Sequence, residues 1–177
     1  MPHLRESEFH HSVVLILEHD DSGAWGVVIN KTIDLALSDV FDQLDIEPTH
    51  SVMGAEKVLR GGPVDEQHGI VLHPPGPTFE STREFKFGVS LSSSRDVLEA
   101  LASGEEPAEH LVLLGHAGWG AGQLEEEIAN NAWLTCEANT DILFETPIAE
   151  RRDRVAKLMG INLDTIVGQT GSSGLAH

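Results

Sequence analysis

The chain is 177 residues long, a length typical of one domain that can bury a substantial core. Its 29 acidic and 11 basic side chains give a formal net charge of -18 when the histidines are neutral. Because nucleic-acid binding draws much of its affinity from Lys and Arg side chains that displace phosphate counterions, this balance argues against direct DNA binding.

Two aliphatic segments near the start, residues 12–18 and 24–30, predict a β-hairpin. The sequence between them, residues 19–23, is rich in Asp, Ser and Gly and predicts a loop of about four or five residues. Both strands are aliphatic at consecutive positions, which is typical of strands buried on both faces. Ser38 then predicts the N-cap of a short helix over residues 39–44.

The middle of the chain predicts a further pair of strands, at residues 58–64 and 69–73. The proline-rich residues 74–77 that follow cannot continue either a strand or a helix. Residues 84–90 alternate polar and apolar side chains and predict a strand with one solvated face. Serines then precede a predicted helix over residues 95–102, which ends before a glycine.

The glycine-rich residues 115–122 predict a sharp turn between a buried strand, residues 111–114, and a helix, residues 121–129. The start of such a helix offers free N–H groups to an anion. However, the three glutamates at 125–127 would repel a phosphate, and the spacing matches neither a P-loop nor a dinucleotide fingerprint. We therefore expect the glycines to serve the packing of Trp119 against the sheet.

The last part of the chain predicts a strand at residues 133–136 and a strand or turn at 141–145. Pro147 opens the last predicted helix, and Gly160 ends it. Residues 168–177 are rich in Gly and Ser, and we expect them to be a disordered tail. Strands that interleave with short helices without a steady βαβ rhythm predict a single α+β domain.

Several of these stretches resemble the AlgH/YqgE family. The clearest is Gly115-x-Ala-Gly-Trp-Gly-Ala-Gly-Gln-Leu-Glu125, supported by Met1-Pro2, by Gly-Gly-Pro-Val at 61–64 and by the strand that ends at His73. The resemblance implies a domain over residues 1–167, with a mixed, mostly antiparallel sheet curled toward a barrel and short helices packed outside. Family members usually carry one further apolar strand, about ten residues earlier.

The sequence holds no recognised catalytic motif. There is no Gly-x-Ser-x-Gly elbow, and Cys136 lies in an apolar stretch where a thiol is usually inert. The ten histidines lack a dense ligand spacing, so we expect no metal and no cofactor. The candidate pocket lies near the glycine-rich stretch and consists of Asn30, His73, His116, Trp119 and Gln123.

The last helix carries a basic cluster that could dock an acidic partner or another copy of the chain. The alternative is that these residues form the solvated face of an amphipathic helix. The cluster consists of Arg151, Arg152, Arg154 and Lys157.

The AlgH/YqgE family has no settled biochemistry and is often described as a family of transcriptional regulators. We expect a binding or regulatory protein with an unknown protein or small-molecule partner and without direct DNA binding. An enzyme with a pocket near the glycine-rich stretch and a scaffold that acts through the basic helix are the alternatives. Without the family's further strand, residues 12–17 would form a sheet edge, which predicts either a homodimer or a start further upstream.

We also expect a cytoplasmic protein that does not enter a membrane. The single cysteine cannot form an internal disulfide, and no apolar run approaches the roughly 20 residues that span a bilayer. The N-terminus has no apolar segment typical of a secretory signal.

Overall fold

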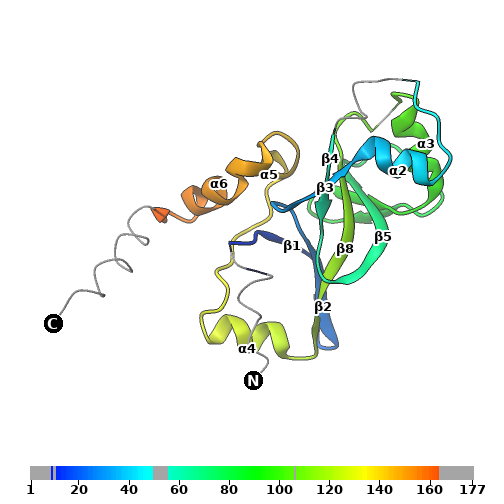
Figure 1. Ribbon diagram of the computed structural model, residues 1–177. Coiled ribbons are helices and arrows are strands. Elements are labelled where there is room, and N and C mark those ends of the chain that lie inside the picture. Colours follow the sequence, from blue (N-terminus) through cyan, green and yellow to red (C-terminus); the bar gives the residue numbers. More distant parts are fainter. Residues whose placement is uncertain (1–8, 10, 50–55, 106, 164–177) are drawn as a thin grey trace.

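Strand β8 (Leu111–Gly120) lies at the centre of the sheet. Its aliphatic first half is almost wholly buried, and it pairs there with β4 in parallel and with β5 in antiparallel orientation. Its second half pairs with β2 in antiparallel orientation (Figure 1). These neighbours are β2 (Gly23–Val28), β4 (Lys57–Arg60) and β5 (Val64–His73). The computed structural model describes residues 9, 11–49, 56–105 and 107–163.

The sheet is nearly closed into a barrel, because the two ends of the strand order β1-β2-β8-β5-β7-β6 approach each other. Glu18 of β1 forms an ion pair with Arg83 of β6. The indole N–H of Trp25 also donates to Glu18, at 2.6 Å, and this bond and Arg83 lower the pKa of the carboxyl. The predicted α+β fold, with a mixed and mostly antiparallel sheet, is confirmed. The remaining strands are β1 (Val14–Asp20), β3 (Thr32–Ala36), β6 (Arg83–Phe85) and β7 (Val89–Ser92).

Strand β8 changes partner from β4 to β2 at a contact between glycines. Gly115 has a φ of +79°, and a Cβ atom there would lie 2.4 Å from the carbonyl oxygen of Gly62. A Cβ on Gly61 would lie 2.2 Å from the carbonyl oxygen of Gly115. Only glycine fits such a crossing of two backbones. The Gly-Gly-Pro motif after β4 therefore lets that strand leave β8, and from Ala117 onward β8 pairs with β2 instead.

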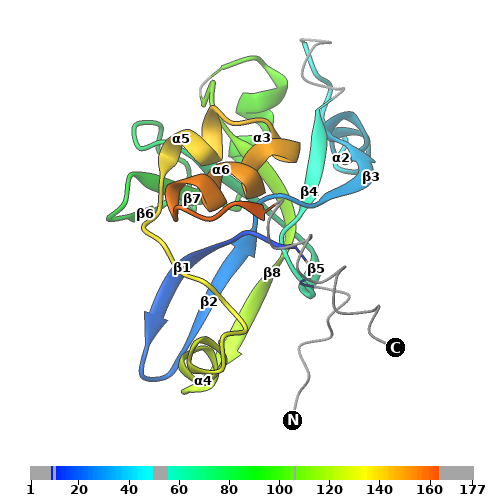
Figure 2. The same ribbon diagram turned by 90° about the vertical axis from the view of Figure 1, so that its left-hand side faces the viewer.

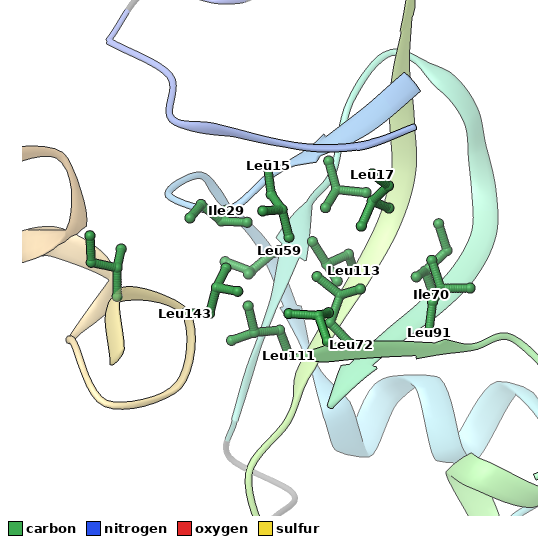
Figure 3. Packing of buried hydrophobic residues seen from close by; sticks show 13 residues of the cluster. Leu15, Leu17, Ile29, Leu59, Ile70, Leu72, Leu91, Leu111, Leu113 and Leu143 are labelled. Atoms are coloured by element: carbon green, nitrogen blue, oxygen red, sulfur yellow. The ribbon is translucent and has the colours of Figure 1, made fainter. Parts of the chain in front are cut away.

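Buried side chains form two main clusters, one on each face of the sheet. The first lies between the sheet and α5 and includes Leu15, Leu59, Leu72, Leu113 and Leu143 (Figure 3). In the second, α2 and α3 cover the other face. Burial of a side chain of this size stabilises the fold by about 1.5–3 kcal/mol. The helices are α2 (Leu37–Gln43), α3 (Arg95–Ala102), α4 (Gln123–Ala129), α5 (Thr140–Phe144) and α6 (Arg151–Leu158), with a 3-10 turn η2 (Ile148–Glu150).

The first hairpin and the helix after it differ in detail from the prediction. Asp20 pairs with Gly23, so the turn has two residues rather than four or five. The Asp20 carboxylate accepts the backbone N–H of Ser22 at 2.8 Å, which closes this tight turn. Helix α2 begins at Leu37, and the carboxylate of Asp39 accepts the N–H of Ala36 at 2.9 Å. Asp39 therefore caps this helix, and the predicted cap at Ser38 is wrong.

The predicted glycine turn at 115–122 is wrong for most of its length, because β8 continues to Gly120. Residues 117–120 are held in the sheet by β2, from Gly26 opposite Ala117 to Gly23 opposite Gly120. Within the stretch a positive φ occurs at its two ends, at Gly115 in the strand and at Gly122 just before α4. Helix α3 spans residues 95–102 as predicted.

Three other predictions are also corrected. Residues 84–90 contain the turn of a hairpin between β6 and β7, because Phe85 pairs with Val89. Residues 133–136 are not a strand but an irregular segment. Residues 140–144 form α5, because the side-chain oxygen of Asn139 accepts the N–H of Asp141 at 2.9 Å and caps the helix. The predicted disordered tail, residues 168–177, lies outside the described residues. Among the residues that the structure describes, no helix is long and apolar enough to span a membrane.

Candidate ligand-binding groove

A groove of about 540 Å³ lies beside β1, and we consider it the best-formed candidate site of the described chain. Val14 and Ile16 of β1 line one side, and Ile128 of α4 lines one end. Val155 of α6 and Met159, just after that helix, line the other end. Residues 132–139, which we call the strap, connect α4 to α5 and cross in front of β1 (Figure 2).

Two segments of the chain border the groove at consecutive positions. Residues 11–16 and residues 132–139 each line it without a break. Successive side chains of an extended segment point to opposite faces, so a segment that presents one face would contribute only alternate residues. Because Val14, Leu15 and Ile16 of β1 all line it, the groove reaches the backbone edge of this strand, and the irregular residues 132–139 border it along their whole length. β1 is also the terminal strand of the sheet, and its other edge has no strand partner within the described residues.

Three aromatic rings close the α4 end of the groove. The rings of Trp119 and Trp133 meet edge to face at 6.0 Å between centroids, and Phe9 contacts Trp133 at 5.7 Å. One carboxylate oxygen of Glu127 accepts both indole N–H groups, at 2.7 Å from Trp119 and 2.9 Å from Trp133. Gln123 donates to the other oxygen at 3.1 Å. Glu127 therefore fastens α4 and the strap to the sheet, a role that sequence reasoning missed.

The structure does not bring the five residues of the predicted pocket into one cavity. Of them, only Trp119 lines the groove, and it is 7% exposed. Asn30 accepts the N–H of Val13 and donates to the carbonyl of His11, both at 2.8 Å, so its amide ties the start of β1 to the end of β2. Gln123 accepts the N–H of Gly120 at 3.0 Å and thereby holds the start of α4.

The two predicted pocket histidines lie elsewhere on the sheet. The ring of His116 contacts the edge of Trp25 at 5.9 Å between centroids. His73 follows Leu72, which pairs with Leu111, eight positions before Trp119 on β8. His73 lies opposite position 110, nine positions before Trp119, so at about 3.3 Å per residue it is roughly 30 Å along the sheet from this groove residue.

His73 contacts a hydroxyl in a way that resembles a catalytic pair but is structural. Its Nδ1 donates to the carbonyl of Pro74 at 2.9 Å, so Nε2 accepts the hydroxyl of Ser92 at 2.9 Å. The Thr82 hydroxyl lies 2.8 Å from that of Ser92. His73 and Ser92 are both fully buried, which leaves no route for a substrate. The bonds satisfy polar groups inside the core, and a nucleophile is not available here.

Comparison with known proteins agrees with this architecture. The AlgH-like family model (DUF179) matches residues 1–164. The chain belongs to the AlgH-like family. It is 47% identical over 172 residues to a UPF0301 protein of Thioalkalivibrio sulfidiphilus, with 97% of this chain and 91% of the relative covered. It is 40% identical over 175 residues to UPF0301 protein VV2869 of Vibrio vulnificus, with 97% and 94% covered.

Two solved structures share the fold of this AlgH-like chain. The solution structure of the AlgH protein from Pseudomonas aeruginosa has a TM-score of 0.79 at 39% identity and covers all of this chain and 90% of the other. A crystal structure of a Corynebacterium diphtheriae protein has a TM-score of 0.64 at 19% identity, with 88% of this chain and 81% of that chain covered. The second likeness concerns the fold alone.

The predicted basic docking surface of this AlgH-like protein is wrong for Arg151. That residue is 4% exposed, and its guanidinium donates to backbone carbonyls. Burial lowers its pKa. Arg152 lines the groove, whereas Arg154 and Lys157 are exposed on α6. The helix therefore presents two separate exposed cations rather than a cluster built around Arg151.

Within the described ranges, no three His, Cys, Asp or Glu side chains gather as they would around a metal ion. Cys136 lies in the strap and is exposed. Ser12 is among the lining residues, and its Oγ atom is buried without a hydrogen-bond partner among the described residues. The groove of this AlgH-like protein therefore presents mainly apolar side chains and backbone groups, an arrangement suited to binding rather than to acid–base or nucleophilic chemistry.

Proposed function

We propose that this AlgH-like protein acts as a regulatory binding protein without catalytic activity, and that the groove beside β1 is its ligand site. The observation that carries the proposal is the groove itself, which is large, mostly apolar and bordered by the unpaired edge of β1. Binding sites combine apolar walls with a few convergent polar groups in this way. Its regulatory effect would then pass through a bound ligand or protein, since the charge of -18 opposes contact with DNA.

The enzyme alternative has weaker support. Its pocket was expected near the glycine-rich stretch, but Trp119 and Gln123 there are both engaged by Glu127. The hydroxyl–imidazole pair of Ser92 and His73 is sealed in the core. We therefore favour binding, and propose that a reaction, if this family member catalyses one, takes place at a different part of the chain.

The proposal is tested with Nile red, a neutral dye that fluoresces in apolar sites and is not repelled by an acidic protein. Two exposed leucines make a matched pair: Leu134 is 66% exposed and lines the groove, and Leu158 is 54% exposed and does not. We expect Leu134→Asp to weaken dye binding strongly, because the charge enters an apolar site, and Leu158→Asp to leave it unchanged.

Both variants should keep their melting temperature within a degree or two, because exposed side chains contribute little to stability. Equal dye binding by the two folded variants would show that the groove is not the ligand site. Absence of dye binding to the unmodified protein would have the same meaning.

A further inference from the structure

We infer that the groove binds an extended segment of another polypeptide, which adds to the free edge of β1 as a further strand and carries basic side chains. This inference rests on the proposed binding function and names the chemistry of the partner. Peptides recognised by strand addition gain affinity from backbone hydrogen bonds and specificity from the side chains that point into pockets.

The backbone of β1 has the pattern that strand addition requires. The N–H of Val28 on β2 donates to the carbonyl of Gly61 at 2.7 Å, away from β1, and Val28 is the residue opposite Val14. The next N–H, of Ile29, donates to Val13 at 2.9 Å. In an antiparallel pair the bonded and non-bonded positions alternate. The N–H and C=O groups of Val14 therefore point away from β2, and those of Ile16, two residues on, do the same.

The side chains of the groove match an added strand as well. Val14 and Ile16 pack against the cluster of Trp119 and Leu124, whereas Leu15 between them points into the main core. An added strand with apolar residues at alternate positions would continue the first of these surfaces. The irregular strap opposite has no backbone–backbone hydrogen bond at positions 133–138 within the described structure, so its N–H and C=O groups are not taken up by a neighbouring strand there.

Charge decides between a foreign segment and a second copy of this chain. A second copy also carries a charge of -18, so pairing of two β1 edges would bring two strongly acidic bodies together. The groove itself is lined by one carboxylate, Glu137, and one guanidinium, Arg152. Beyond the groove, β1 ends at exposed Asp20, and Glu125 of α4 contacts His19 of the same strand. A segment with Lys or Arg beside its apolar residues fits this surface better than an acidic one does.

The experiment uses the full chain and a fluorescein-labelled peptide of alternating Val and Lys, about eight residues long, which is enough for one strand. The control is the same peptide with Glu in place of Lys. We expect saturable binding of the Val/Lys peptide by anisotropy, weaker binding at about 0.3 M salt because the charges are screened, and no binding of the Val/Glu peptide. Equal binding of both peptides would overturn the proposed basic partner.

Backbone pairing is tested by N-methylation of the peptide on one set of alternate residues and then on the other. A strand that adds to β1 loses its inward donors in one case only, so we expect roughly a tenfold or greater loss of affinity for one set and little change for the other. In NMR exchange experiments, the amides of Val14 and Ile16 should be protected on binding. Equal affinity of both methylated peptides would overturn strand addition.

The outcomes separate this inference from the function on which it rests. If Nile red binds in the groove but neither peptide does, the groove is a ligand site for another chemistry and the strand inference fails alone. If a dimer forms by light scattering and the Val/Lys peptide dissociates it, the occupant of the edge is a second copy, and the inferred foreign segment is wrong.

Discussion

Arg151 satisfies carbonyl groups that two separate segments leave unpaired inside the fold. Its guanidinium donates to the carbonyls of Ile142 at 3.1 Å and Leu143 at 2.8 Å in α5, and to that of Ile29 just after β2. No carboxylate accepts from it among the described contacts, so backbone dipoles replace its hydration. Arg suits this position because its fork of five donors can reach several acceptors at once. One residue thereby joins α5 and α6 to the sheet.

Replacement of Arg151 should therefore be among the more damaging single changes. We expect Arg151→Ala to lower the free energy of unfolding by about 3–5 kcal/mol, because it leaves several buried carbonyls unpaired and removes packed volume. Arg154→Ala, at an exposed position of the same helix, should change it by less than about 0.5 kcal/mol. Urea unfolding followed by circular dichroism gives both values. Equal effects of the two substitutions would contradict a structural role for Arg151.

At the scale of elements, β8 shows why a glycine-rich sequence is a poor guide to a turn. Gly115 is held by a backbone crossing and has a positive φ, whereas a Cβ on Gly118 would meet no atom within 4 Å. The sequence cannot distinguish these two roles, because both residues are glycines within the same short stretch. In the strap a strand was predicted where none forms. Trp133, Leu134 and Thr135 favour a strand by residue type, but they have no ladder partner within the described chain.

The two glycines of β8 should therefore respond differently to the same substitution. We expect Gly115→Ala to lower stability by about 3 kcal/mol or more, since its Cβ would lie 2.4 Å from the Gly62 oxygen in a strained backbone. Gly118→Ala should be within about 0.5 kcal/mol of the unmodified protein, because the site is open and extended. Denaturant titrations measure both. A large loss at Gly118 would mean that something beyond local space requires a glycine there.

For the whole molecule, sequence patterns predicted the fold class but not the site. The α+β architecture, the first hairpin and the bounds of α3 follow from local hydrophobic patterns and helix signals. The groove depends instead on residues far apart in the chain, such as Ile16, Trp133 and Met159, which no local pattern relates. Asn30, His73 and Gln123 are polar residues in or beside the segments that resemble the family, yet their partners are backbone groups and neighbouring side chains. Polarity near a family motif therefore indicated internal hydrogen bonds rather than a pocket.

The net charge of the whole molecule opposes binding to DNA. The exposed cations Arg154 and Lys157 lie on a helix of eight residues beside the exposed carboxylate of Asp153, and the chain as a whole carries -18. Each phosphate contact needs a cation that releases counterions, and an acidic body repels the polyanion before such contacts form.

We therefore expect no sequence-selective binding of duplex DNA at physiological salt, and no retardation in a gel-shift titration up to micromolar protein. Lower salt, about 50 mM, should not rescue binding, because weaker screening strengthens the repulsion as well. This differs from a weak basic DNA-binding protein, whose affinity rises steeply as salt falls. A sequence-selective complex with a submicromolar Kd would show that regulation passes through DNA directly, and would remove the reason for placing it in a bound partner.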